Sequence, residues 1–544
     1  MPSYRKLAMR VLGRPLHTGG SDSPRPASQR AAALILTAAM LTTLTAPAFA
    51  KEWYIEEGDI TVKAGDTEGT NKVSQGENPE VEDTNTVITN SDKDKASSNT
   101  VTIEAKDKDD KVEVTLKDLN IDASRGSEAA VSVTGEGNTN IELDGDNELK
   151  SGIYSSGISS SGSLTISGGE NDSLTAQGGS GADGISSSGS LTISGGTVTA
   201  NGGSSGGGDG GDGIWSSGGV TISGGSTVTA NGGDGKDDYG GDGICSDSFT
   251  IYGGTVNAKG GNGGNVSGAG IISDGGVTIS GGTVKATGGD SKDGYGGDGI
   301  RSGGVTISGG TVNAAGGNGG KVGGYGICSF ARVAISGGTV NAAGGNGKNS
   351  NGGSDGIISN DIDLSGSLEL TAKAGRPNGK AISWAGHELD LDTIKDKLGP
   401  GAKVTTTDAD GKVNQVSVPR PVEPEEPVIP GESSSSSDGG SAAPSAPASP
   451  LPGLTVTDKD GQRISYTSTQ SGNSLTVCVG RLTASFRISL AALRQLRAEG
   501  IDTITFQTIL CSTTLSVDEL LAMGGEDAEA VLTHRLTASS LTVG

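Results

Sequence analysis

A fixed repeat, an alternating apolar pattern and a long stretch without proline predict an all-β fold, a parallel β-helix with about 28 residues per coil. Seven copies of the phrase Val-Thr-Ile-Ser-Gly-Gly, or close variants of it, lie between residues 164 and 338. Their central isoleucines are Ile166, Ile193, Ile222, Ile251, Ile279, Ile307 and Ile335, spaced 27, 29, 29, 28, 28 and 28 residues apart. Such a period is typical of a solenoid, in which each unit buries its apolar face only against its neighbours.

Each repeat carries three short apolar phrases that alternate with period two, which indicates three strands per coil. The phrases are Gly-Ile-x-Ser, then Val-Thr-Ile-Ser-Gly-Gly, then Thr-Val-Thr-Ala or Thr-Val-Asn-Ala. No proline lies between Pro79 and Pro377. Interior strands of a β-helix pair on both sides and need every backbone N–H, so proline is excluded from them. A Gly/Ser-rich disordered tract, the main alternative, would show neither the period nor this exclusion.

The first 50 residues are expected to be a signal peptide, because basic residues precede an apolar run over 31–44 and Ala48-Phe49-Ala50 follows it. We therefore expect a protein that is secreted and lies outside the cell or at its surface. This apolar run is too short to span a membrane, and no later segment approaches the required length of about 18 apolar residues. The formal net charge of −24 argues against a nucleic-acid partner. The oligomeric state is not predicted.

The remaining chain divides into five predicted parts. Residues 51–150 are expected to form early, less regular coils of the β-helix, and residues 151–374 the regular repeats. Residues 375–418 would cap it with a helix over 391–398 and a hairpin around 408–411. A Pro/Ser-rich linker follows over 419–453. Residues 454–544 read as a small α+β domain of unknown role, with helices capped by Ser489 and Ser516.

The four cysteines give two different expectations. Cys245 and Cys328 share a column three coils apart, which places them roughly 14 Å from each other and too far apart for a disulfide. Cys478 and Cys511 lie in the C-terminal domain, where they are free to pair, but two cysteines alone do not establish a bond.

Catalysis is not predicted, because neither histidine after residue 50, His387 or His534, lies in the repeats. This excludes histidine-based triads and most zinc sites from the coils. A polysaccharide lyase would need a basic residue beside a cation site, and Arg301 near Asp298 is the one such pair. A solvated surface arginine explains the same observation.

Acidic residues recur two positions before the isoleucine of the Gly-Ile phrase: Asp183, Asp212, Asp242, Asp298 and Asp355. Asp183, Asp212 and Asp242 would stack on adjacent coils at ~5 Å, where like charges repel by roughly 1 kcal/mol per pair in water. Calcium would relieve this repulsion, so Asp183, Asp212, Asp242 and Asp298 are candidate metal ligands. The alternative is that each aspartate caps its own glycine turn.

Aromatic residues are scarce, and four outward side chains form a candidate carbohydrate-binding set: Trp215, Tyr239, Tyr295 and Arg301. Tyr239 and Tyr295 each lie five residues before the isoleucine of their coil and are two coils apart, roughly 10 Å. This spacing suits stacking on alternate units of an extended polysaccharide. Scattered surface aromatics, which need no function, are the alternative.

Three phrases, Val114-Thr-Leu-Lys-Asp-Leu-Asn-Ile-Asp122, Asn140-Ile-Glu-Leu-Asp-Gly-Asp-Asn147 and the repeated Leu/Val-Thr-Ile-Ser-Gly-Gly, carry a family resemblance. The chain over roughly 52–375 resembles secreted bacterial carbohydrate-binding domain-containing proteins. The resemblance implies a right-handed, pectate-lyase-like parallel β-helix that binds polysaccharide without cleaving it, with calcium in some relatives.

The predicted function is therefore a secreted, non-catalytic polysaccharide-binding β-helix, with calcium as a candidate assisting ion. The first alternative is a structural adhesin or surface spacer that displays the C-terminal domain. A β-helix polysaccharide lyase is the third.

Overall fold

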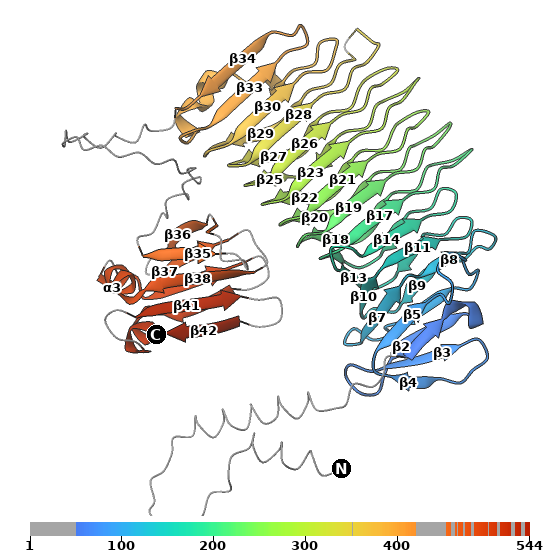
Figure 1. Ribbon diagram of the computed structural model, residues 1–544. Coiled ribbons are helices and arrows are strands. Elements are labelled where there is room, and N and C mark those ends of the chain that lie inside the picture. Colours follow the sequence, from blue (N-terminus) through green and yellow to red (C-terminus); the bar gives the residue numbers. More distant parts are fainter. Residues whose placement is uncertain are drawn as a thin grey trace, which may run out of the picture. The chain divides into compact units, whose positions relative to one another are not determined.

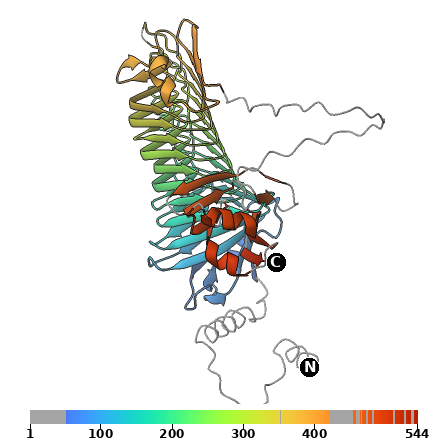
Figure 2. The same cartoon turned by 90° about the vertical axis from the view of Figure 1, so that its left-hand side faces the viewer.

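The computed structural model describes residues 51–350 and 352–419, and residues 453–543 apart from gaps at 458–462, 465, 472–473, 480–482, 499, 509–511, 524–527 and 535–538. Between residues 51 and 419 the chain winds into a right-handed parallel β-helix with about 28 residues per coil (Figure 1). Figure 2 shows the coils stacked one on the next. The predicted fold class is confirmed.

Each regular coil contributes three strand segments to two sheets, in the order that the three phrases predict. The Gly-Ile and Val-Thr-Ile segments lie in a first sheet of 22 strands, and the Thr-Val-x-Ala segments lie in a second sheet of 12. In several coils the first two segments join without a break, as in β18 (Ile214–Ile222). Elsewhere they are separate, as in β15 (Ile185–Ser187) and β16 (Leu191–Ile193).

The other strands of the first sheet are β1 (Lys51–Tyr54), β2 (Ile60–Ala64), β3 (Asn71–Gln75), β4 (Val81–Asp83), β5 (Thr86–Thr89), β6 (Val101–Glu104), β7 (Lys111–Lys117), β9 (Val131–Thr134), β10 (Asn138–Asp144), β12 (Ile158–Ser160), β13 (Ser163–Gly168), β20 (Ile244–Ile251), β22 (Ile271–Ile279), β24 (Ile300–Ser302), β25 (Val305–Ile307), β27 (Ile327–Ile335), β29 (Ile357–Leu364), β31 (Ile382–Trp384) and β32 (His387–Glu388). The second sheet contains β8 (Asn120–Asp122), β11 (Asp146–Lys150), β14 (Ser173–Gln177), β17 (Thr197–Asn201), β19 (Thr227–Asn231), β21 (Thr255–Lys259), β23 (Thr283–Thr287), β26 (Thr311–Ala315), β28 (Thr339–Ala343), β30 (Glu369–Lys373), β33 (Lys403–Thr407) and β34 (Val413–Ser417).

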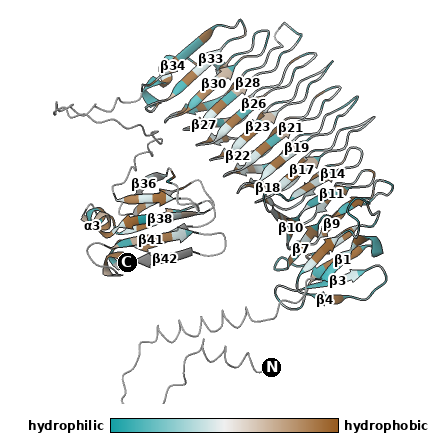
Figure 3. Cartoon of the chain, viewed as in Figure 1, coloured by the Kyte–Doolittle hydropathy of each residue, from teal (hydrophilic) through white to brown (hydrophobic). Residues whose placement is uncertain are grey.

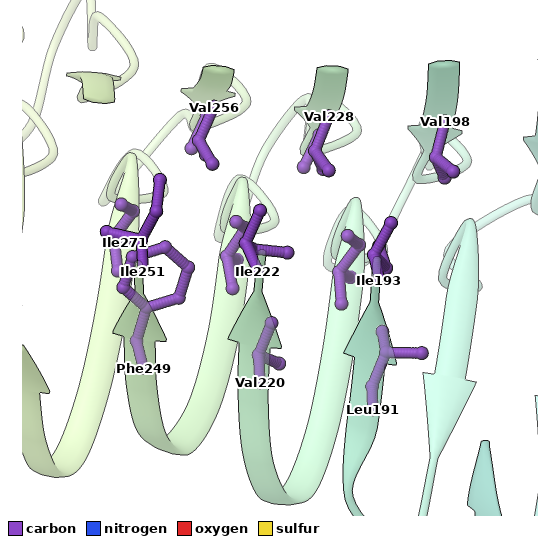
Figure 4. Close-up of a cluster of buried hydrophobic side chains, with 14 of the residues drawn as sticks. Leu191, Ile193, Val198, Val220, Ile222, Val228, Phe249, Ile251, Val256 and Ile271 are labelled. Atoms are coloured by element: carbon purple, nitrogen blue, oxygen red, sulfur yellow. The ribbon is translucent and has the colours of Figure 1, made fainter. Parts of the chain in front are cut away.

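The core is built from columns of identical or similar side chains in exact register between coils. Ile193 pairs with Ile222, which pairs in turn with Ile251, and all three are fully buried. Figure 4 shows these isoleucines facing the valines of the second sheet across the interior. Hydrophobic residues accordingly form bands along the strands (Figure 3). Burying each such side chain stabilises the fold by about 1.5–3 kcal/mol, so every coil adds its own share.

The turn after the Val-Thr-Ile phrase is short, and in five of the seven copies the second glycine of the phrase adopts a left-handed conformation. Gly282 and Gly310, for example, have φ angles of 75° and 77°. Residues with a side chain rarely adopt these angles, which explains the glycine at this position. In the copy that ends at Gly225 the left-handed residue is instead Gly224.

The return from the second sheet to the first is a longer glycine-rich turn, with an outgoing leg and a return leg. Glycines of the two legs form one continuous zigzag of backbone hydrogen bonds across the coils, which we call the glycine stack. Gly261 N donates to Gly241 O, Gly268 N to Gly261 O, and Gly289 N to Gly268 O, at 2.8–2.9 Å. A Cβ atom on Gly268 would lie 1.9 Å from Gly241 O, so no side chain fits there.

Residues 51–150 share the hydrophobic core of the regular repeats, through parallel pairs such as β7 with β10. At this end β2, β3 and β4 pair antiparallel. At the other end β33 and β34 form an antiparallel hairpin around 408–411. The helix expected over 391–398 is instead a 3₁₀ helix, η2 (Leu391–Lys397), whose first turn is capped by the Asp390 carboxylate.

The C-terminal residues have a separate core and form two four-stranded sheets with two helices, α3 (Leu490–Ala498) and α4 (Val517–Met523). Ser489 Oγ accepts a hydrogen bond from Ala492 N at the start of α3. The strands are β35 (Leu454–Thr457), β36 (Thr467–Ser471), β37 (Ser474–Cys478), β38 (Ala484–Ser489), β39 (Thr503–Gln507), β40 (Ser512–Ser516), β41 (Glu529–His534) and β42 (Ser539–Val543).

Several expectations fall outside the described residues. These are the signal peptide over 1–50, nearly all of the linker over 419–453, and the pairing of Cys478 with Cys511, because Cys511 is not described. Among the residues that are described, no helix combines the length and the apolar character needed to cross a bilayer.

Candidate functional site

Asp183, Asp212 and Asp242 stand on three consecutive coils, and we call them the aspartate column. Each lies on the return leg of the long turn, two residues before a buried isoleucine that fixes its position. Asp183 Oδ1 accepts a hydrogen bond from Asp212 N at 2.9 Å, and Asp212 Oδ1 accepts one from Asp242 N at 2.6 Å. The column therefore links each coil to the next. The alternative that each aspartate caps its own turn is wrong, because the N–H belongs to the following coil.

Burial makes the charge of this column costly. It raises the pKa of Asp212 to about 8, with Asp242 and then Asp183 adding repulsion. Burial also raises the pKa of Asp242 to about 6, although the Ala269 N–H and Arg301 act in the opposite direction. Removing a carboxylate from water disfavours its charged form, and a neighbouring carboxylate disfavours it further. At neutral pH the column thus carries less negative charge than its three aspartates would carry in water.

Asp298 does not join this column. Ala269 occupies the intervening coil, and Asp298 Oδ1 accepts a hydrogen bond from Tyr325 N at 2.7 Å. Asp298 is only 8% exposed, and burial raises its pKa to about 6. Arg301 Nε lies 3.9 Å from Asp298 Oδ2, which confirms the expected proximity of this pair.

The structure adds a thiol beside the column that the sequence analysis did not connect with it. Oxygen atoms of Asp212 and Asp242 and Sγ of Cys245 all lie within 4.8 Å of one another. Calcium takes six to eight oxygen ligands. Here one oxygen of each carboxylate is already bonded to a backbone N–H, and sulfur is a poor calcium ligand. The fit to calcium is therefore incomplete, and water would have to supply most of the shell.

Both cysteines of the coils are free. Cys245 and Cys328 lie in one column, separated by Ile272 and Arg301, as predicted. Burial raises the pKa of each thiol to about 12, with nearby aspartates adding to the effect, so both are protonated at neutral pH.

Tyr239 and Tyr295 lie on the return leg near the tip of the long turn, 53% and 46% exposed. Isolated backbone bridges connect Tyr239 to Val266, and Val266 to Tyr295, which confirms that the two tyrosines are two coils apart in one column. Lys321 Nζ lies 5.5 Å from the centre of the Tyr295 ring. The two rings thus stand on a stacked edge of the β-helix with a valine between them.

Trp215 and Arg301 occupy a different column, on strands of the first sheet. Trp215 is half-buried and pairs with Cys245, whereas Arg301 is exposed and lies 5.3 Å from the Phe330 ring. Trp215 and Arg301 are three coils apart, with Cys245 and Ile272 on the two coils between them. The four candidate carbohydrate-binding residues therefore form two lines rather than one cluster.

A second hydrogen-bonded column, missed from the sequence, runs along the outgoing leg of the long turn. We call it the Asn/Asp ladder, and its members are Asp234, Asn262, Asp290, Asn318 and Asn346. Each side-chain Oδ1 accepts a hydrogen bond from the backbone N–H at the same position of the next coil, at 2.6–3.1 Å. All five side chains are exposed. The signal was present in the sequence, because Asp or Asn follows Gly-Gly in each of these repeats.

Four ladder residues, Asp234, Asn262, Asp290 and Asn318, line an open cavity of about 920 Å³ along the long turns. Lys236, Lys292 and Lys348 line the same cavity. Amide and carboxylate groups together with ammonium groups make this a polar groove.

Comparison with known proteins supports the β-helix fold and does not identify a ligand or an activity. Residues 191–214, 220–244, 249–271, 277–300 and 305–327 match a family model described as a beta helix repeat. The central coils are similar to this repeat. Each match runs from a Val-Thr-Ile strand through the long turn to the next Gly-Ile isoleucine. No curated protein and no solved structure matches the chain.

Proposed function

We propose that this protein is secreted and binds polysaccharide, without cleaving it, along the long turns of its β-helix at or near the cell surface. The observation that carries the proposal is the pair of exposed tyrosines, Tyr239 and Tyr295, held in one column two coils apart. Aromatic rings offer a large apolar surface together with a polar hydroxyl group, which suits the faces of sugar rings. The stacked backbone fixes the spacing of the two residues, so binding does not have to order the backbone.

The test is affinity electrophoresis of the full chain through gels that contain neutral or acidic polysaccharides. We expect retardation by at least one glycan, with no shortening of that glycan. The double variant Tyr239→Ala/Tyr295→Ala should weaken retention about ten-fold, since each stacked ring contributes roughly 0.5–1.5 kcal/mol. Tyr252→Ala is the matched control, because Tyr252 is 54% exposed but lies outside the long turn. An equal loss in the control, or no retardation by any glycan, would overturn the proposal.

We propose calcium as an ion that assists binding at Asp212 and Asp242. Without a bound cation, these two carboxylates repel each other. Repeating the gels with calcium and with a chelator tests this. Unchanged retention in chelator removes calcium from the proposal and leaves glycan binding intact.

A spacer or adhesin role is the second candidate, favoured by the separate hydrophobic core of the C-terminal domain. In that case the β-helix would only display the domain, and the tyrosine variants would leave cell-surface display unaffected.

A further inference from the structure

At the tips of the long turns, one position alternates between two residue types, so the pattern repeats every two coils rather than every coil. The position two residues after each ladder residue is occupied in turn by Lys236, Gly264, Lys292, Gly320 and Lys348, and Gly206 holds the equivalent position on the coil before the ladder. Backbone bridges such as Ser205 to Gly235 and Gly235 to Gly263 establish this register. Lysine and glycine thus alternate over six consecutive coils.

Backbone packing enforces the gaps between the lysines. A Cβ atom on Gly264 would lie 2.7 Å from Lys236 O, and one on Gly320 would lie 2.1 Å from Lys292 O. Side chains are therefore excluded from the intervening coils. Lys348 Nζ reaches back to donate a hydrogen bond to Lys292 O at 3.4 Å, which places both lysines on one line across Gly320.

The Asn/Asp ladder alternates in step with the lysines over four coils. The Lys236 and Lys292 coils carry Asp234 and Asp290, and the coil that follows each of them carries Asn262 or Asn318. At these two positions, a coil with an Asp and a Lys thus alternates with a coil with an Asn and a Gly. Among the described residues, Lys236, Lys292 and Lys348 form no ion pair. The Lys348 ammonium donates to a backbone carbonyl oxygen, which leaves its charge unpaired, so all three positive charges that line the groove are available to an anionic ligand.

We propose that this groove binds a linear glycan that repeats every two sugars and carries one anionic group per repeat. The proposal rests on the polysaccharide-binding function proposed above and names its ligand class. Two coils span about 10 Å, since coils stack at about 4.8 Å, which is close to two pyranose units of an extended chain. The ammonium of every second coil pairs with the anionic group, and ladder oxygens accept hydrogen bonds from sugar hydroxyls.

The mixed charge of the groove limits how anionic the glycan is. Asp234, Asp290 and Asp293 line the groove together with the three lysines, so the six charges balance. A glycan with a carboxylate on every sugar would place half of its charges beside Gly264 and Gly320, the turn tips where glycine stands in place of lysine. One anionic group per two sugars avoids this mismatch.

The test uses the full chain in affinity gels with three probes. Hyaluronan has one carboxylate per disaccharide, polygalacturonate has one on every sugar, and hydroxyethyl cellulose has none. We expect hyaluronan to be bound at least about ten-fold more tightly than polygalacturonate at equal salt. The triple variant Lys236→Gln/Lys292→Gln/Lys348→Gln should abolish this preference.

The matched control is Lys259→Gln/Lys285→Gln/Lys373→Gln, which removes three exposed lysines from strands of the second sheet. An equal loss in the control would mean that only net charge matters and would overturn the proposal. Tighter binding of polygalacturonate would overturn it as well. If only hydroxyethyl cellulose is retained, this inference fails and the proposed function survives. If no probe and no other glycan is retained, both fail.

Discussion

Two columns of side chains run along the long turns of the same coils and make the same hydrogen bond in different surroundings. In the aspartate column and in the Asn/Asp ladder, Oδ1 accepts the N–H of the equivalent residue one coil later. Both columns directly follow glycines of the stack, as in Gly241-Asp242 and Gly233-Asp234. The ladder is exposed, whereas the column is largely shielded by the return leg and the first sheet.

This difference explains the residues that each column contains. Only the acceptor oxygen is needed to connect the coils, and asparagine and aspartate supply it equally well. The exposed ladder indeed mixes both residues. The column contains aspartates only, although burial raises their pKa values and disfavours their charged form, a cost in stability that asparagine would not have. A cost of this kind is typical of residues that are retained for function.

The largest expected effect comes from the glycine stack, on which both columns depend. A Cβ atom in Gly297→Ala would lie 1.8 Å from Gly268 O, so the variant should lose about 3 kcal/mol or more of stability. Gly225→Ala is the control, because no atom lies within 4 Å of its added Cβ. It should change stability by less than about 0.5 kcal/mol. Urea unfolding followed by circular dichroism measures both, and equal midpoints would contradict the described packing.

The second largest effect comes from replacing aspartate with asparagine, which removes a charge but keeps the acceptor oxygen, in each of the two columns. Asp212→Asn keeps the acceptor for Asp242 N and removes the buried charge, so at pH 8 it should stabilise the protein by about 2 kcal/mol. Asp234→Asn makes the same change on the exposed ladder and should have an effect within about 0.5 kcal/mol. Urea midpoints of both variants provide the measurement. If Asp212→Asn is neutral or destabilising, burial does not oppose the charge of the column.

The wild type and Asp212→Asn should also differ in how their stability depends on pH. The pKa of Asp212 is raised to about 8 in the folded state, so folded protein holds a proton that unfolded protein has already lost. Stability from this group therefore falls as pH rises from about 4 to about 8, by at most about 1.4 kcal/mol per pH unit. The advantage of Asp212→Asn over the wild type should grow across this window and level off above it. A constant difference between pH 4.5 and pH 8.5 would show that the pKa is not raised.

The smallest effect concerns the hydrogen bond of the exposed ladder. Asp290→Ala removes the acceptor for Asn318 N, and water replaces it at this exposed position, so the loss should be about 0.5–1 kcal/mol. Asp290→Asn keeps the acceptor and should equal the wild type. Amide hydrogen exchange at Asn318 should accelerate in the alanine variant alone. Unchanged exchange in both variants would mean that the ladder does not protect this N–H.

The sequence predicted the coil, the three strands and the column positions, because the buried isoleucines and valines recur with one period. It did not predict the glycine stack, since Gly-Gly was interpreted as a turn and hydrogen bonds between the two legs depend on their spacing in three dimensions. The link that Asp212 makes between coils was not predicted for a related reason: its partner, the Asp242 N–H, lies 30 residues away, in the next coil. Cys245 was placed in its own column, and only the side-chain directions bring its Sγ near Asp242.

The alternation at the tips of the turns has a consequence for how such a chain can lengthen. A duplication or deletion of one coil would preserve the core, because every coil offers the same apolar surface to its neighbours. It would also shift all later lysines by one step relative to the earlier ones, and a ligand that spans the junction would meet two bare tips or two lysines in succession. Gain or loss of 56 residues, by contrast, leaves the pattern in phase. Variation in length among natural variants is therefore expected in pairs of coils wherever the groove is in use.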